Sequence, residues 1–67
     1  MTDTTLLRKT IASKGLKLNF VANSLNLTPY GLAKKIDGVS EFKQSELVKL
    51  KLLLNLDEDS FNAIFFT

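Results

Sequence analysis

The side chains in this sequence that could do chemistry are lysines, one tyrosine and carboxylates, because the chain contains no histidine and no cysteine. Those absences exclude disulfides, thiolate metal sites, Ser-His-Asp triads and most general acid–base schemes at neutral pH. No nucleophile–base pair or metal cluster is present either, so we expect a protein that is not an enzyme, has no small-molecule substrate and needs no cofactor.

The basic side chains gather in the first half of the chain. From Thr4 to Ile36 there is no acidic residue, and the basic residues there are Arg8, Lys9, Lys14, Lys17, Lys34 and Lys35. A surface of one sign is what binding to a polyanion requires, so nucleic acid is the first partner to consider. The alternative is an ordinary solvated surface with a chance bias, and charge alone does not separate the two readings.

Length and composition bound the architecture. The chain has 67 residues, of which 45% are hydrophobic, and this predicts one domain spanning residues 1–67 that is stabilised by apolar packing. No stretch is long and apolar enough to span a membrane, and the residues after Met1 lack the features of a secretory signal. We therefore expect a cytoplasmic protein without membrane contact.

Apolar spacing predicts five short helices and no strand, which is an all-α fold. The expected helices cover residues 4–14, 18–25, 29–36, 44–54 and 57–66. Gly15 and Gly38 are placed to end the first and third of them, and Asn26 tolerates the left-handed conformation in the turn between the second and third. Phe42, in the loop before the fourth helix, is expected to pack under that helix. No internal repeat is apparent.

The strongest start signal lies at Thr28-Pro29, where a capping hydroxyl is followed by proline at the first helical position. The connection before it is short, which predicts a steep crossing of the second and third helices, with the small side chain of Ala22 between them. Leu32 and Ile36 recur at helical spacing and should face the core. The opposite side of the third helix then points outward.

The C-terminal stretch is unusually apolar for one short helix. Phe61, Ile64 and Phe65 recur at helical spacing, and Phe66 adds a further aromatic ring. Such a tail indicates either a partner or dimer surface or simple closure of the core, and core closure suits Phe61 and Ile64 better than Phe65 and Phe66. Leu52 falls off the core stripe of its helix and is expected to be buried or to face a dimer partner.

Three segments together carry a family resemblance: GLKLNFVANSLNLTPYGLAKKIDG, EFKQSELVKLKLLLNL and the terminal FNAIFF. Over roughly residues 4–66 the sequence resembles the Cro and repressor-type helix-turn-helix family of temperate phages. Within it, the chain looks most like the small Cro-like and modulator-of-repression (antirepressor) proteins of Gram-positive phages. The resemblance implies a compact five-helix, lambda-repressor-like domain whose third helix enters the major groove of operator DNA.

The resemblance also implies site residues. Facing base edges would be Pro29, Tyr30, Ala33 and Lys34, with Thr28 in the turn beside them, while Lys17, Asn19, Lys35 and Lys43 would lie nearer phosphates. Leu52, Phe61, Phe65 and Phe66 would form a partner or dimer surface. The pattern departs from the family where Lys17 and Leu18 open the second helix and Pro29 opens the third.

Two functions from different classes follow. One is a Cro-like DNA-binding regulator of a lysis–lysogeny switch in a bacterial host, and the other is an antirepressor that binds the phage repressor directly and modulates its operator binding. Between Thr28 and Ile36 there is no arginine, glutamine or asparagine to read bases, so DNA binding is expected to be weak or moderate. The basic segment favours the first function, and the apolar C-terminal aromatics favour the second.

Overall fold

The computed structural model describes residues 2–66, and within this range the chain forms five α-helices and no strand. The helices are α1 (Thr4–Ser13), α2 (Leu18–Ser24), α3 (Pro29–Ile36), α4 (Gln44–Leu53) and α5 (Glu58–Phe65). The all-α prediction is confirmed. Four of the expected helices are one or two residues too long, because the positions at their ends serve as caps: Lys14, Leu25, Leu54, Asp57 and Phe66.

Side chains just before the helices satisfy the free backbone N–H groups of the first turns. The Asp3 carboxylate accepts from the N–H of Leu6 at 3.0 Å. The Thr28 hydroxyl accepts from the N–H of Gly31 at 2.9 Å, and Pro29 occupies the first position of α3. These local hydrogen bonds explain why α1 and α3 begin where the sequence predicted.

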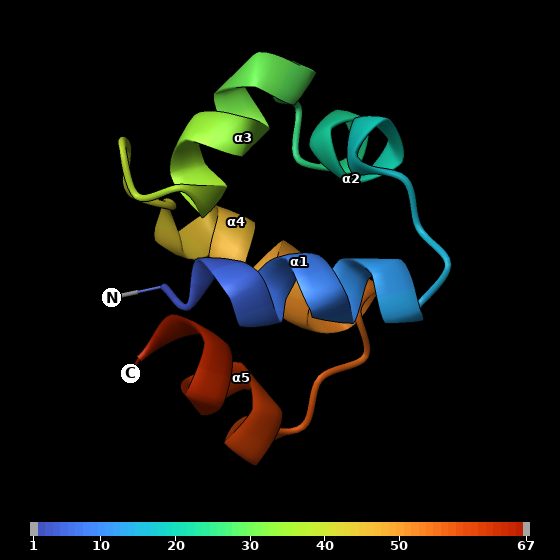
Figure 1. Cartoon of the computed structure of the whole chain (residues 1–67), viewed down its shortest axis with the longest axis vertical. Helices are drawn as coiled ribbons and strands as arrows, with labels where there is room; N and C mark the ends of the chain where they lie inside the picture. Colours follow the sequence, from blue (N-terminus) through green and yellow to red (C-terminus); the bar gives the residue numbers. More distant parts are fainter. Residues whose placement is uncertain (1, 67) are drawn as a thin grey trace.

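All five helices contribute to one apolar core. Its buried members are Leu7, Ile11, Val21, Ala22, Leu25, Leu32, Ile36, Leu50, Leu54, Ile64 and Phe65, each at most 4% exposed. Figure 1 shows α1 (blue) running across the middle of the molecule, with α3 on one side of it and α5 (red) on the other. Phe42, Leu27 and Leu16 pack against this core from the connecting segments, as does Leu6 from α1.

The α2–α3 pair is joined by a tight turn. Asn26 has φ of 58°, the left-handed conformation that asparagine tolerates better than most residues. The N–H of Leu27 donates to the carbonyl of Ala22 at 2.8 Å, which closes the end of α2. In Figure 1, α2 is seen almost along its axis while α3 crosses the view, so the two helices run in clearly different directions.

The α4–α5 pair repeats that turn. Asn55 has φ of 52°, and the N–H of Leu56 donates to the carbonyl of Lys51 at 3.0 Å. Asp57 then caps α5 by accepting from the N–H of Ser60 at 2.8 Å, as Thr28 caps α3. Residues 25–28 and 54–57 share the pattern Leu-Asn-Leu followed by a capping residue. The two turns therefore use the same short local pattern.

The longest helices, α1 and α4, have 10 residues each. A helix needs about 20 apolar residues to cross a bilayer. Within residues 2–66, accordingly, no helix meets the length and hydropathy that membrane crossing demands.

Candidate nucleic-acid interface on α3

The two sides of α3 differ in burial as the sequence predicted. Leu32 and Ile36 are 1% and 0% exposed, whereas Tyr30 on the other side is 74% exposed. Pro29 is also exposed, and Ala33 and Lys34 are partly exposed. The core thus fixes which side of α3 faces solvent.

The side chains of Tyr30 and Lys34 contact each other on this outward side. They stand four residues apart, which brings side chains together on one helix face. The Lys34 ammonium lies 5.4 Å from the centroid of the Tyr30 ring, within the range of a cation–π contact. In the part of the chain that the structure describes, Lys34 forms no ion pair with a carboxylate. Its charge is therefore available to an external anion.

Lys35 does not belong to this surface, which corrects its assignment as a phosphate contact. Its ammonium lies 2.6 Å from the Glu46 carboxylate, and the two side chains are only 13% and 9% exposed. The pair joins α3 to α4. Glu46 is not among the predicted site residues, although it stands three residues after Lys43, where a capping-box carboxylate reaches back to the helix start.

The Glu46 carboxylate is held in its charged form. Burial acts to raise its pKa, but the hydrogen bond from Lys35, the hydrogen bond from the backbone N–H of Lys43 and the charges of both lysines outweigh burial. The net pKa of Glu46 is lower than its ordinary value. The backbone hydrogen bond measures 2.8 Å and also satisfies the first turn of α4.

A second carboxylate close to α3, that of Asp37, also forms an ion pair. Asp37, directly after α3, accepts a hydrogen bond from the guanidinium of Arg8 on α1 at 3.1 Å. Both side chains are substantially exposed, so the pair is a weak one. Even so, Arg8 offsets the only acidic residue that adjoins α3 in sequence.

The remaining predicted DNA contacts are exposed but less constrained. Lys17 and Asn19 lie at the start of α2, and Lys43 immediately precedes α4; all three are exposed. Thr28 is exposed too, but its hydroxyl is engaged in capping α3. The polar groups around α3 are thus few, and most of them are charged groups that can bind a phosphate but do not distinguish one base from another.

The predicted partner surface at the C-terminus divides into buried and exposed residues. Phe65 is 4% exposed and belongs to the core, which corrects its assignment to an interface. Its ring meets that of Phe42 edge-on, with centroids 5.8 Å apart, and lies 5.1 Å from that of Phe61. Phe61 is half-buried, whereas Phe66 and Leu52 are 62% and 76% exposed.

These exposed residues border a groove between α4 and α5. The groove encloses about 720 Å³, and apolar side chains form most of its walls. Val48 and Leu52 come from α4, and Phe61 and Phe66 from α5 and its end. This apolar surface is separate from the outward side of α3.

Comparisons with known proteins add no assignment: no family model matches this chain, and no curated protein or solved structure was found to match it. Among residues 2–66, no three side chains of the metal-binding types converge on a common point. Function must therefore be inferred from the charges and geometry of the chain itself.

Proposed function

We propose that this chain is a DNA-binding transcriptional regulator that lays α3 in the major groove of duplex DNA. One observation carries the proposal: α3 presents Tyr30 and Lys34 outward, free of competing carboxylates. Asp37, which directly follows α3, and Glu46, which contacts Lys35 of α3, are each paired with a basic side chain. The resemblance noted in the sequence extends the proposal to a Cro-like regulator that acts in a phage lysis–lysogeny switch, in the cytoplasm of a bacterial host.

The chemistry of the α3 face defines how it would bind. The Lys34 ammonium can donate to the guanine O6 and N7 acceptors or to a phosphate, and the Tyr30 hydroxyl can donate to a phosphate. Lys17 and Lys43 would neutralise phosphates on either side. Because only Lys34 and Tyr30 carry polar groups toward the bases, we expect strong dependence on salt and modest discrimination between sequences.

The test is a fluorescence anisotropy titration of operator duplex across several salt concentrations, with Lys34→Glu as the decisive variant. We expect the substitution to weaken binding by about tenfold or more at low salt. The slope of log affinity against log salt concentration should decrease by roughly the amount that one phosphate contact contributes. Lys9→Glu is the matched control, because Lys9 is exposed on α1 and the charge change is the same. Equal losses for the two variants, or none for Lys34→Glu, would remove α3 from the interface.

A second candidate function is favoured by the groove between α4 and α5. Val48, Leu52 and Phe66 are more than half exposed there, which is unusual for three large apolar side chains around one groove. An antirepressor would use such a surface to dock on the DNA-binding domain of a larger phage repressor and alter its grip on operators.

Purified repressor separates the two candidates. An antirepressor should bind little DNA alone, yet form a stable complex with repressor and change the affinity of repressor for operator. Leu52→Lys should then abolish the complex while leaving the fold intact, because Leu52 is 76% exposed. Val39→Lys is the matched control, since Val39 is 72% exposed in the loop after α3, outside the groove. Complex formation by Leu52→Lys at unchanged affinity would contradict this role.

A further inference from the structure

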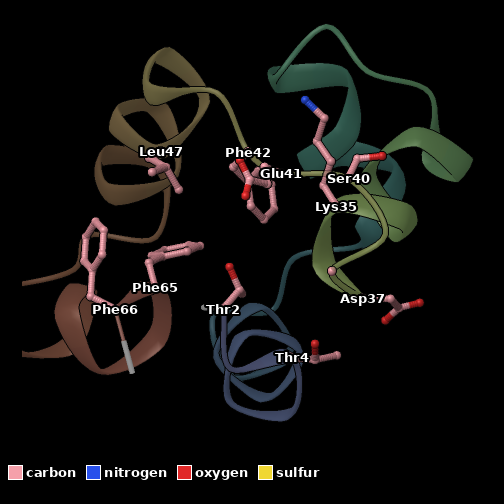
Figure 2. A pocket seen from close by; sticks show the side chains of 11 residues that line it. Thr2, Thr4, Lys35, Asp37, Ser40, Glu41, Phe42, Leu47, Phe65 and Phe66 are labelled. Carbon is pink, nitrogen blue, oxygen red and sulfur yellow. The ribbon is translucent and has the colours of Figure 1, made fainter.

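A second cavity lies on the side of the molecule where the chain ends meet the loop after α3. It encloses about 590 Å³, a size typical of small-molecule sites. Thr2, the segment from Asp37 to Phe42, and the end of α5 form its walls. Figure 2 shows side chains from these separate segments surrounding one open space.

One side of this cavity is aromatic. Phe42, Phe65 and Phe66 line it together with Leu47 of α4. The Phe42 and Phe65 rings meet edge-on, at an interplanar angle of 86°, so their positions are fixed by mutual packing. Phe66 is 62% exposed and leaves a ring accessible to a ligand. Aromatic faces attract both apolar groups and cations.

The polar side of the cavity holds one uncompensated negative charge. Among its lining residues, Lys35 is paired with Glu46, and Asp37 is paired with Arg8. Glu41 also lines the cavity and is exposed, and within residues 2–66 its carboxylate has no hydrogen-bond or ion-pair partner. Figure 2 shows the side chains of Glu41 and Phe42 on the segment between α3 and α4.

Two helix ends add to this negative potential. The segment after α3 and the last residues of α5 both border the cavity, and a helix C-terminus carries partial negative charge. The first turn of α4, which carries the opposite partial charge, is already occupied by the Glu46 carboxylate. Carbonyls at both ends already accept hydrogen bonds, from Thr4 at Ile36 and from Asp3 at Ile64, so the free carboxylate of Glu41 is the main source of cation attraction.

We propose that this cavity binds a small organic cation, a primary ammonium on an aromatic body, with the ammonium at Glu41 and the body against Phe42 and Phe66. The size of the cavity, its aromatic wall and its single free carboxylate each match one part of such a ligand. The cavity does not include Tyr30 or Lys34, so this proposal does not depend on the DNA-binding proposal. It shares Phe42, Leu47 and Phe66 with the groove between α4 and α5, whereas Glu41 lines this cavity and not the groove.

Three probes of similar size that carry the same phenyl ring test the proposal by ¹H–¹⁵N NMR titration of the full chain. They are 2-phenylethylammonium, the neutral 2-phenylethanol and the anionic phenylacetate. We expect the cation to bind with Kd on the order of 1 mM and to shift the amide signals of Gly38, Ser40, Glu41 and Phe66. The neutral probe should bind more weakly at the same residues, and the anion should not bind measurably.

The variants separate charge recognition from apolar contact. Glu41→Gln should weaken binding of the cation by about fivefold and leave binding of 2-phenylethanol unchanged. Phe66→Ala should weaken binding of both the cation and 2-phenylethanol. Because Phe66 is exposed, the variant should still fold. Asp59→Asn is the control, since it removes one exposed carboxylate from the first turn of α5, outside the cavity.

Three results would overturn the proposal. Equal affinity for all three probes would show that the cavity does not recognise charge. Signal shifts confined to Val48 and Leu52 would place the ligand in the other groove. An unchanged affinity of Glu41→Gln for 2-phenylethylammonium would remove Glu41 from the site.

Discussion

The α2–α3 pair and the α4–α5 pair are joined by turns of the same sequence pattern and the same hydrogen bonds, yet their outward surfaces differ in charge. After the first turn, α3 begins with Pro29 and Tyr30 and has no acidic residue in its first turn. After the second, α5 begins with Glu58 and Asp59. The α5 surface would repel the polyanion that the α3 surface can accept. The turn therefore sets the geometry of each pair, and the residues that follow it set the charge of the surface.

The pairs also differ in how closely their helices pack. Ala22 and Lys51 are equivalent, because the carbonyl of each accepts the N–H that closes its turn. Ala22 is completely buried. Lys51 is partly exposed, pairs with Glu58 and places its ammonium 5.3 Å from the centroid of the Phe61 ring. The first pair tolerates only a small residue at this position, and the second accommodates a long one.

Replacing each of these two equivalent residues by leucine should give the largest difference in stability between the two helix pairs. Ala22→Leu inserts three carbons into a filled core and should lower the free energy of unfolding by about 2–3 kcal/mol. That loss is a large share of the stability of a domain of this size. Lys51→Leu should change the free energy of unfolding by no more than about 0.5 kcal/mol, because the side chain is at the surface. Urea unfolding followed by circular dichroism measures both, and similar losses would show that the pairs pack alike.

The ion pairs that hold α4 to its neighbours give the next largest contrast. Glu46→Gln leaves the Lys35 ammonium unpaired in a shielded site and should lower the free energy of unfolding by about 2 kcal/mol. Glu58→Gln breaks the pair with Lys51, where Glu58 is 73% exposed, and should cost less than about 0.5 kcal/mol. The same urea titrations apply. If Glu58→Gln lowered the free energy of unfolding as much as Glu46→Gln, the Lys35–Glu46 pair would not be the stronger of the two.

The two capping residues should differ in their pH dependence. Hydrogen bonds from Ser60, chiefly from its backbone N–H, hold the pKa of Asp57 below its ordinary value of 3.8. The capping contribution of Asp57 is therefore complete above pH 3.8 and is lost as the pH falls through the lower, folded-state pKa. The destabilisation caused by Asp57→Ala should shrink on acidification.

Thr28 has no titrating group, so the cost of Thr28→Ala, about 1 kcal/mol, should stay constant over the same range. Thermal unfolding of both variants and the parent chain between neutral and acidic pH provides the measurement. A cost for Asp57→Ala that does not change with pH would show that its charge plays no part in capping α5.

Local signals explain which features of the fold could be predicted from the sequence. Thr28 and Asp57 precede their helices as capping residues, and Gly15, Asn26 and Gly38 all adopt the positive φ expected of them. Each of these features depends on a few consecutive residues. Leu32 and Ile36 were also placed correctly, because helical periodicity separates the buried side of α3 from its outward side.

Features that depend on distant contacts could not be predicted in this way. The sequence predicts Lys35 as a phosphate contact, since nothing local to α3 reveals that Glu46, 11 residues later, meets its ammonium. Phe65 shares helical spacing with Phe61 and Ile64, but its edge-on contact with Phe42, in the loop before α4, is not visible in the local sequence. The sequence therefore predicts which side of α3 is exposed, but it does not predict which of the lysines on α3 is neutralised by a carboxylate.

One backbone contact has a practical consequence. The N–H of Asp3 donates to the carbonyl of Ile64 at 2.6 Å, so the first and last segments of the described chain lie side by side, as Figure 1 shows. A fluorophore or affinity tag attached at either end would sit beside Thr2 and Phe66, at the mouth of the cavity that they line. Asn23→Cys, at an exposed position on α2, would introduce a single thiol for labelling that leaves this region uncrowded.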